Sequence, residues 1–183
     1  MQWGGTEYHL QVDALQLLKM KWDMIIAFPP CTYVTNAGAR HLWAGGKLNE
    51  ERYKKGLAAK EFFMRFYNAD CPKIAIENPV ASSIYGLPKY SQIIQPYQFG
   101  HSATKKTCLW LKGLPLLKPT NEVEKPIYRK FVQKNGNVRS TCWEMEHQGS
   151  LSRSKTFPGI AKAMAEQWAG ENVAPVYQQE RLF

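Results

Sequence analysis

Two short segments of the chain carry residue types that could form a covalent active site. Cys31 follows Pro29 and Pro30 at the end of one apolar run, and Glu77 and Asn78 stand together at the end of another. A cysteine thiolate is a nucleophile, a carboxyl group can move a proton, and an amide can orient a loop or a substrate. These residue types therefore predict a nucleophile, an acid and an orienting group.

Each segment also has an ordinary structural interpretation. A proline pair commonly ends a strand, a single cysteine is often a packed apolar residue, and Glu77-Asn78-Pro79 could form a turn. The two segments together are more specific than either alone. In open α/β sheets the active site lies beyond the carboxyl ends of the strands, so consecutive parallel strands would bring both segments to one place.

The elements around these segments predict an α/β fold. Residues 22–28 and 73–79 are apolar runs of the kind found in strands buried on both faces. Residues 49–68 between them predict a helix with Asn49 as its N-cap and two acidic residues in its first turn. Strand, helix and strand form a right-handed βαβ unit. We therefore expect a mostly parallel sheet flanked by helices.

The rest of the chain adds shorter elements. We expect a strand over residues 7–12, one or two helical turns over 14–20, a third strong strand over 107–111 and a final helix over 156–168.

Residues 114–155 contain three prolines, many polar groups and little periodicity, which predicts an irregular insertion. We expect these elements to form one domain over residues 1–170, followed by an extended tail over 171–183.

Composition limits the classes of protein and partner. Lys and Arg number 24 against 15 Asp and Glu, a net charge of +9, which favours a polyanionic partner, although a basic surface can also serve solubility. The four cysteines include no C-x-x-C pair, so we expect no structural zinc site and no bound metal. No apolar run approaches the roughly 20 residues of a membrane span, and we expect a cytoplasmic protein.

The motifs resemble those of the cytosine-C5 DNA methyltransferases of phages and bacteria. That family carries Pro-Cys after its fourth strand and Glu-Asn-Val after its fifth, and Pro30-Cys31 and Glu77-Asn78 match these, with Pro79 in place of the valine. The segment 99–107 is similar to the family's Gly-containing turn and basic strand, with Lys105 and Lys106 in place of arginines. The segment 157–161 stands where the family has its last motif.

The resemblance implies chemistry on a cytosine flipped out of the DNA duplex. Cys31 would add to carbon 6 of the ring, which makes carbon 5 nucleophilic. Glu77 would hold or protonate ring nitrogen 3, and Asn78 would position the loop or the base. Lys105 and Lys106 would steady the Cys31 loop or a phosphate, unless they form a solvated surface pair.

The family's cofactor site is incomplete in this sequence. The cofactor that the resemblance implies is S-adenosylmethionine, whose contacts here would come from Asp13, Pro29 and Pro30; Asp13 could equally cap a helix. The family's Gly-rich turn has no counterpart, which makes the fold a truncated Rossmann-like methyltransferase fold. The chain could be a fragment of a longer enzyme, be completed by a second subunit or in a homo-oligomer, or have dropped methyl transfer and kept a binding role.

The insertion over 114–155 is a reduced version of the family's target-recognition region. It is basic and interleaved with aromatic residues, which is typical of a nucleic-acid contact, although a solvated loop is the alternative. The residues that we expect to contact DNA here are Arg129, Lys130, Lys134 and Arg139.

The last five residues form a separate motif. Gln179, Leu182 and Phe183 match the Gln-x-x-Leu-Phe peptide that bacterial replication proteins insert into the sliding clamp. Leu182 and Phe183 would fill an apolar pocket and Gln179 would fix the backbone, as in other extended-peptide recognition. The alternative is a frayed terminus.

The resulting functional hypothesis is a DNA cytosine-C5 methyltransferase-like protein with Cys31 as nucleophile. One alternative is a non-catalytic DNA-binding or decoy module on the same scaffold. Another is an enzyme that modifies free pyrimidine nucleotides, which the small recognition region favours and the basic insertion opposes.

Overall fold

The chain is a mixed α/β protein with a four-stranded main sheet. The computed structural model describes residues 10–39, 41–127, 129–132, 136, 138–141 and 156–169. It divides into two units: residues 1–93 with 107–114, and residues 94–106 with 115–183.

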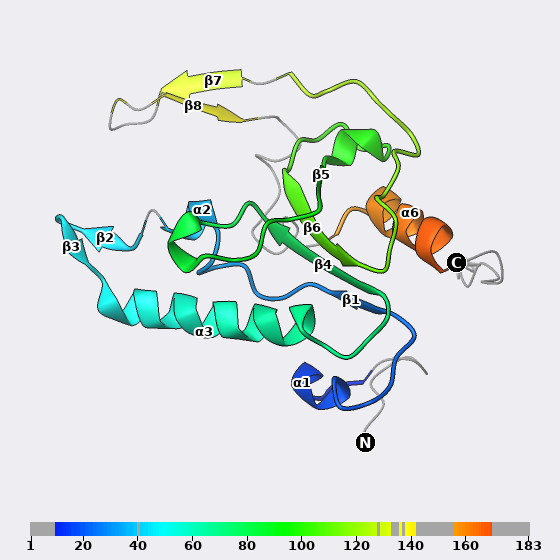
Figure 1. Cartoon of the computed structure of the whole chain (residues 1–183). Helices are drawn as coiled ribbons and strands as arrows, with labels where there is room; N and C mark the ends of the chain where they lie inside the picture. The colour runs from blue at the N-terminus through cyan, green and yellow to red at the C-terminus, as the bar shows by residue number, and fades with distance from the viewer. Residues whose placement is uncertain are drawn as a thin grey trace, which may run out of the picture. The chain divides into compact units, whose positions relative to one another are not determined.

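A parallel pair of strands lies at the centre of the first unit (Figure 1). β1 (Ile25–Ala27) pairs with β4 (Ile74–Pro79), and the register places Ala27 opposite Ile76. The two predicted strands are confirmed, although β1 is shorter than the apolar run over 22–28. Since the strands are parallel, their carboxyl ends lie at the same edge of the sheet.

One long helix connects these strands. α3 (Glu50–Tyr67) begins where the sequence predicts, and Asn49 Oδ1 accepts a hydrogen bond of 3.0 Å from the backbone N–H of Arg52. Phe63 and Phe66 on α3 are buried in the core cluster that also holds Ile74 and Ile76. Burial of apolar side chains of this size contributes about 1.5–3 kcal/mol each, so packing of α3 fixes the βαβ unit.

The prediction of a mostly parallel sheet is wrong. β6 (Thr107–Lys112) runs antiparallel to β4, and the strand order is β1-β4-β6-β5, with β5 spanning Gln92–Ile94. A parallel neighbour needs a crossover connection, usually a helix. Between β4 and β6 the chain forms only β5 and the 3-10 turns η1 (Ser83–Tyr85) and η2 (Pro96–Gln98), so it returns antiparallel.

Short elements complete the first unit. α1 (Ala14–Leu17) follows Asp13, and α2 (Asn36–Ala39) follows the Cys31 segment. A small hairpin of β2 (Trp43–Ala44) and β3 (Lys47–Leu48) leads into α3. The strand expected over residues 7–12 lies largely outside the described residues.

The second unit contains the final helix and a strand pair. α6 (Pro158–Trp168) is confirmed, with Pro158 in its first turn. The segment 114–155 contains an antiparallel pair, β7 (Arg129–Val132) and β8 (Val138–Thr141), which the sequence did not predict. No helix in the described part of the chain is long and apolar enough to cross a bilayer.

Substitution of a glycine in α3 would test how closely this helix is packed. A Cβ at Gly56 would overlap the ring and hydroxyl of Tyr85. Alanine normally stabilises a helix interior by about 1 kcal/mol over glycine, but overpacking costs about 1–3 kcal/mol. We therefore expect Gly56→Ala to lower the free energy of unfolding by up to about 2 kcal/mol in urea titration.

The exposed residue Ala58 on the same helix provides the matched control. Ala58→Gly measures the propensity difference where no side chain intervenes, and should cost about 1 kcal/mol. A stabilised Gly56→Ala protein would show that Tyr85 does not pack against α3.

Candidate active site

The two predicted site segments meet at the carboxyl ends of β1 and β4. The Asn78 side chain donates a hydrogen bond from Nδ2 to the carbonyl oxygen of Pro29 at 3.3 Å. Asn78 is completely buried, and its Oδ1 has no hydrogen-bond partner among the described residues. The amide therefore holds the backbone two residues before Cys31, which assigns Asn78 to positioning the loop.

Cys31 differs from the other described cysteines. Cys71 and Cys108 are buried with 2% and 0% exposure, whereas Cys31 is half-buried. The Cys71 thiol donates to the carbonyl oxygens of Trp22 and Lys73, both at 3.2 Å. The packed-apolar interpretation of a cysteine thus applies to Cys71 and Cys108. Cys142 lies outside the described residues.

The backbone after Cys31 is tied to the segment that follows β4. The backbone N–H of Asn36 donates to Val80 O at 3.1 Å, and that of Ser82 donates to Val34 O at 2.8 Å. These bonds flank an isolated bridge between residues 35 and 81. The Cys31 loop is therefore held along its length by the end of the neighbouring strand.

Arg52 of α3 also holds this loop, and the sequence analysis did not identify it. Its guanidinium donates to Gly38 O from Nε at 3.3 Å and from Nη2 at 3.1 Å, and Nη2 reaches Thr32 O at 3.5 Å. The signal in the sequence was a basic residue in the first turn of a helix, where the dipole disfavours positive charge. Its partners are backbone carbonyls, which leave no pattern in a sequence.

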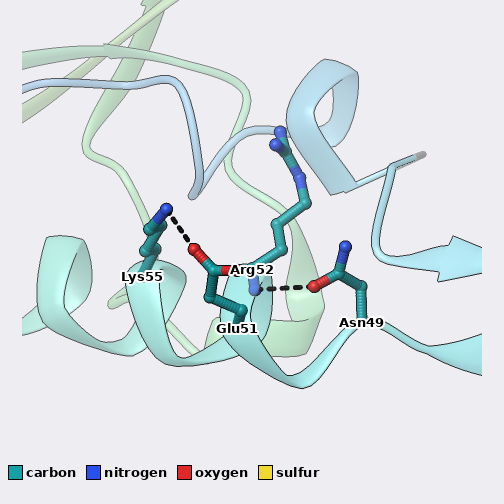
Figure 2. Close-up of polar contacts among 4 residues, drawn as sticks. All are labelled: Asn49, Glu51, Arg52 and Lys55. Carbon is teal, nitrogen blue, oxygen red and sulfur yellow. Dashed lines mark hydrogen bonds and ion pairs between the residues drawn. The ribbon is translucent and has the colours of Figure 1, made fainter.

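One ion pair on α3 lies at the surface. Lys55 and Glu51 form an ion pair of 2.6 Å, as Figure 2 shows. The hydrogen bond and charge of Lys55 lower the pKa of Glu51, and the same pair raises the pKa of Lys55. An exposed pair of this kind adds little stability.

Tyr85 lies beside the same helix. It stacks on Tyr53 with ring centroids 6.0 Å apart, and its hydroxyl has no partner among the described residues. Burial raises the pKa of Tyr85, while the positive charge of Arg52 acts in the opposite direction.

Glu77 lies in β4, directly before Asn78 and near the carboxyl end of the strand. It is half-buried, and its backbone pairs with Leu109 of β6. Successive side chains in a strand point to opposite faces, so Glu77 and Asn78 address different sides of the sheet. Asn78 faces the loop that it holds, and the role of Glu77 as a proton-transfer group stays a prediction from the sequence.

The predicted basic residues belong to the second unit and are described by themselves. Lys105 is half-buried and Lys106 is exposed. Arg129 and Lys130 lie in β7, and Arg139 lies in β8 opposite residue 131. Lys134 and the clamp-like residues Gln179, Leu182 and Phe183 lie outside the described residues.

The predicted cofactor residues border an apolar cavity of about 430 Å³. Pro29 and Pro30 line it, whereas Asp13 accepts a hydrogen bond from the Leu15 N–H at 3.0 Å and caps α1. The remaining lining residues are Ala14, Leu17, Leu18, Trp22, Met24, Ile25, Ile26, Ala27, Phe28, Phe62 and Phe66.

This cavity fits only part of S-adenosylmethionine. Its size is in the range of ligand sites, and its walls suit a flat ring such as adenine. Among the described residues that line it, none has a charged side chain for the ammonium or carboxylate groups, and the indole N–H of Trp22 donates to Leu17 O at 2.7 Å. Nor do the described residues hold a cluster of His, Cys, Asp or Glu side chains that could bind a metal ion.

Comparisons with protein-family models, curated proteins and solved structures found no match to this chain. The features that bear on function are therefore the geometry of the strand ends and the motifs they carry.

The exposure of the cysteines leads to a direct test. In a Cys142→Ser protein, we expect native Cys31 to react with iodoacetamide, while Cys71 and Cys108 react only after unfolding, because a buried thiol must wait for an opening event. Peptide mass mapping identifies the labelled residue. Equal labelling of Cys31 and Cys108 in the native protein would contradict the described burial, and Cys31→Ser supplies the blank.

Proposed function

We propose that this chain acts on cytosine in DNA through covalent addition of Cys31 to the pyrimidine ring. The four-stranded sheet would then correspond to the second part of a Rossmann-like methyltransferase fold. The site of action would be the cytoplasm of a bacterial host.

One observation carries this proposal: an accessible cysteine lies on a loop fastened to the strand that bears Glu77 and Asn78. Asn78 bonds to Pro29 O, two residues before Cys31, and the parallel register of β1 and β4 puts both ends at one edge. Residues on adjacent strand ends can be held more rigidly for general acid–base catalysis than residues on separate loops.

The chemistry follows from the two side chains. The Cys31 thiolate forms a bond to carbon 6, and the electrons of the carbon 5–carbon 6 double bond shift toward carbon 5. A proton held by Glu77 at ring nitrogen 3 withdraws charge from the ring. Carbon 5 then takes up an electrophile, and in water that electrophile is a proton. Loss of a proton from carbon 5 and expulsion of the thiolate restore the cytosine.

A non-catalytic DNA-binding or decoy module is the second candidate. The absence of charged side chains among the described residues that line the cavity beside Pro29 and Pro30 favours it, because methyl transfer needs charged and polar groups that hold the whole cofactor. The two candidates differ in whether Cys31 reacts with the ring at all.

Exchange of hydrogen at carbon 5 tests the covalent step without a cofactor. DNA with tritium at carbon 5 of cytosine should release tritium into water when incubated with the protein. We expect Cys31→Ser to abolish release, and Glu77→Gln to slow it by about 100-fold or more, since a positioned acid or base typically contributes 10²–10⁴-fold. Cys71→Ser is the control at a cysteine outside the site.

The result also separates the two candidates. No release by a folded wild-type protein that still binds DNA would contradict the enzymatic proposal and favour the binding module. Release that persists in Cys31→Ser would contradict the assigned nucleophile.

We further propose that the C-terminal residues dock the chain onto a bacterial sliding clamp. The support is the spacing of Gln179, Leu182 and Phe183, two adjacent apolar anchors after a polar residue. Such anchors dominate the binding energy of short extended peptides.

A binding measurement with immobilised clamp checks the docking. Leu182→Ala with Phe183→Ala should weaken binding at least about tenfold, which corresponds to about 1.4 kcal/mol. Arg181→Ala, at a position that the motif leaves open, should change it little. Equal binding by both proteins would contradict the docking mode.

A further inference from the structure

Arg52 occupies a position that the helix itself does not favour. It lies in the first turn of α3, three residues after the N-cap Asn49, where the helix dipole opposes a positive charge. Residues in the first turn of a helix are usually neutral or acidic, as Glu50 and Glu51 are here. The cost of the charge must be offset by contacts made outside the helix.

Those contacts go to the Cys31 loop and to α2, the short helix that directly follows it. Figure 2 shows the Arg52 side chain leaving α3 toward the short helix above it, while Glu51 pairs with Lys55 instead. The guanidinium donates to Gly38 O from two nitrogens, reaches Thr32 O, and lies 5.1 Å from the centroid of the Tyr33 ring. An arginine fork that bonds two carbonyls and covers an aromatic ring fixes a loop more closely than a point charge could.

The loop is also shaped to bring these carbonyls together. A Cβ at Gly38 would overlap the carbonyl of Thr32, and the Gly38 N–H donates to Thr35 Oγ1 at 3.2 Å. Residues 32 and 38 therefore lie too close together to leave room for a side chain at position 38. Arg52 binds at this point of closest approach.

Cys31 consequently lies between two backbone carbonyls that accept hydrogen bonds from side chains. Asn78 holds the carbonyl of Pro29, two residues before it, and Arg52 reaches the carbonyl of Thr32, directly after it. The two side chains come from different elements, β4 and α3, so each constrains the loop independently.

We infer that Arg52 is a positioning residue for Cys31, which sets the rate of attack on the pyrimidine and not the affinity for DNA. This rests on the function proposed above. Misplacement of a reacting group by about 1 Å can cost about 100-fold in rate, so a loose loop lowers turnover while the DNA-binding surface stays intact.

The test compares Arg52→Ala with Lys54→Ala and Arg52→Lys. Lys54 is exposed on the same helix, so Lys54→Ala removes the same charge without touching the loop. At saturating DNA, tritium release by Arg52→Ala should fall about 10–100-fold, with the half-saturating DNA concentration within about twofold of wild type. Arg52→Lys should recover part of the rate, and Lys54→Ala should keep it.

Opposite outcomes overturn the inference. An unchanged rate of tritium release at saturating DNA would do so. An increase in the half-saturating DNA concentration with no change in the saturated rate would also do so, because it would indicate that Arg52 contacts a phosphate. Urea titration shows whether each variant folds. If Arg52→Ala does not fold, Arg52→Lys is compared with wild type. Lysine has a shorter reach and lacks the guanidinium fork, so its saturated rate should still be lower.

A second readout works even if the proposed function fails. In the Cys142→Ser background, the rate constant for alkylation of Cys31 by iodoacetamide should change by at least about threefold in Arg52→Ala and by less in Lys54→Ala. If the wild-type protein releases no tritium, the proposed function fails, and this rate alone decides whether Arg52 positions the thiol. An unchanged rate would then reject it.

Discussion

The parallel pairing of β1 with β4 is the constraint on which the candidate site depends. Two strands separated by about 45 residues of chain end at the same sheet edge only because α3 carries the chain back across the sheet. Phe63 and Phe66 hold that helix against Ile74 and Ile76, and their burial supplies the energy that keeps the register. Without this packing, Cys31 and Asn78 would belong to unrelated loops.

Asn78 shows how the site depends on a polar group in an apolar place. A buried amide with an unpartnered oxygen costs about 1–3 kcal/mol. Asn78 Nδ2 donates to Pro29 O. The free-energy cost of the buried oxygen is therefore compensated by a fixed loop and not by contact with a substrate. The sequence left two roles open for this residue, the loop or the base. Complete burial favours the loop, and under the proposed function contact with the ring is left to Cys31 and Glu77.

The sequence predicted those features that depend on local patterns. Apolar runs located β1, β4 and β6, and a polar residue before an acidic turn located the start of α3, because burial and capping act through neighbouring residues. The direction of β6 was not predictable in the same way. An apolar run such as 107–111 is equally compatible with both directions. Only the preceding chain, which holds short turns and no long helix, determines that β6 returns antiparallel to β4.

The role of Arg52 could not be predicted from the sequence, for a related reason. Its partners are the carbonyls of Thr32 and Gly38, and every residue offers a carbonyl, so no pairing of residue types marks the contact. The positions of Asn78 and Arg52 around Cys31 also bear on the cofactor. Neither lies among the lining residues of the apolar cavity, but Pro29, whose carbonyl Asn78 holds, is one of them. The loop that carries Cys31 therefore also forms part of the cavity wall, and a change at Asn78 would act on both. Under the proposed function, addition to the ring would depend on the position of Cys31, whereas methyl transfer would also need charged groups for the cofactor, which the described lining residues do not include.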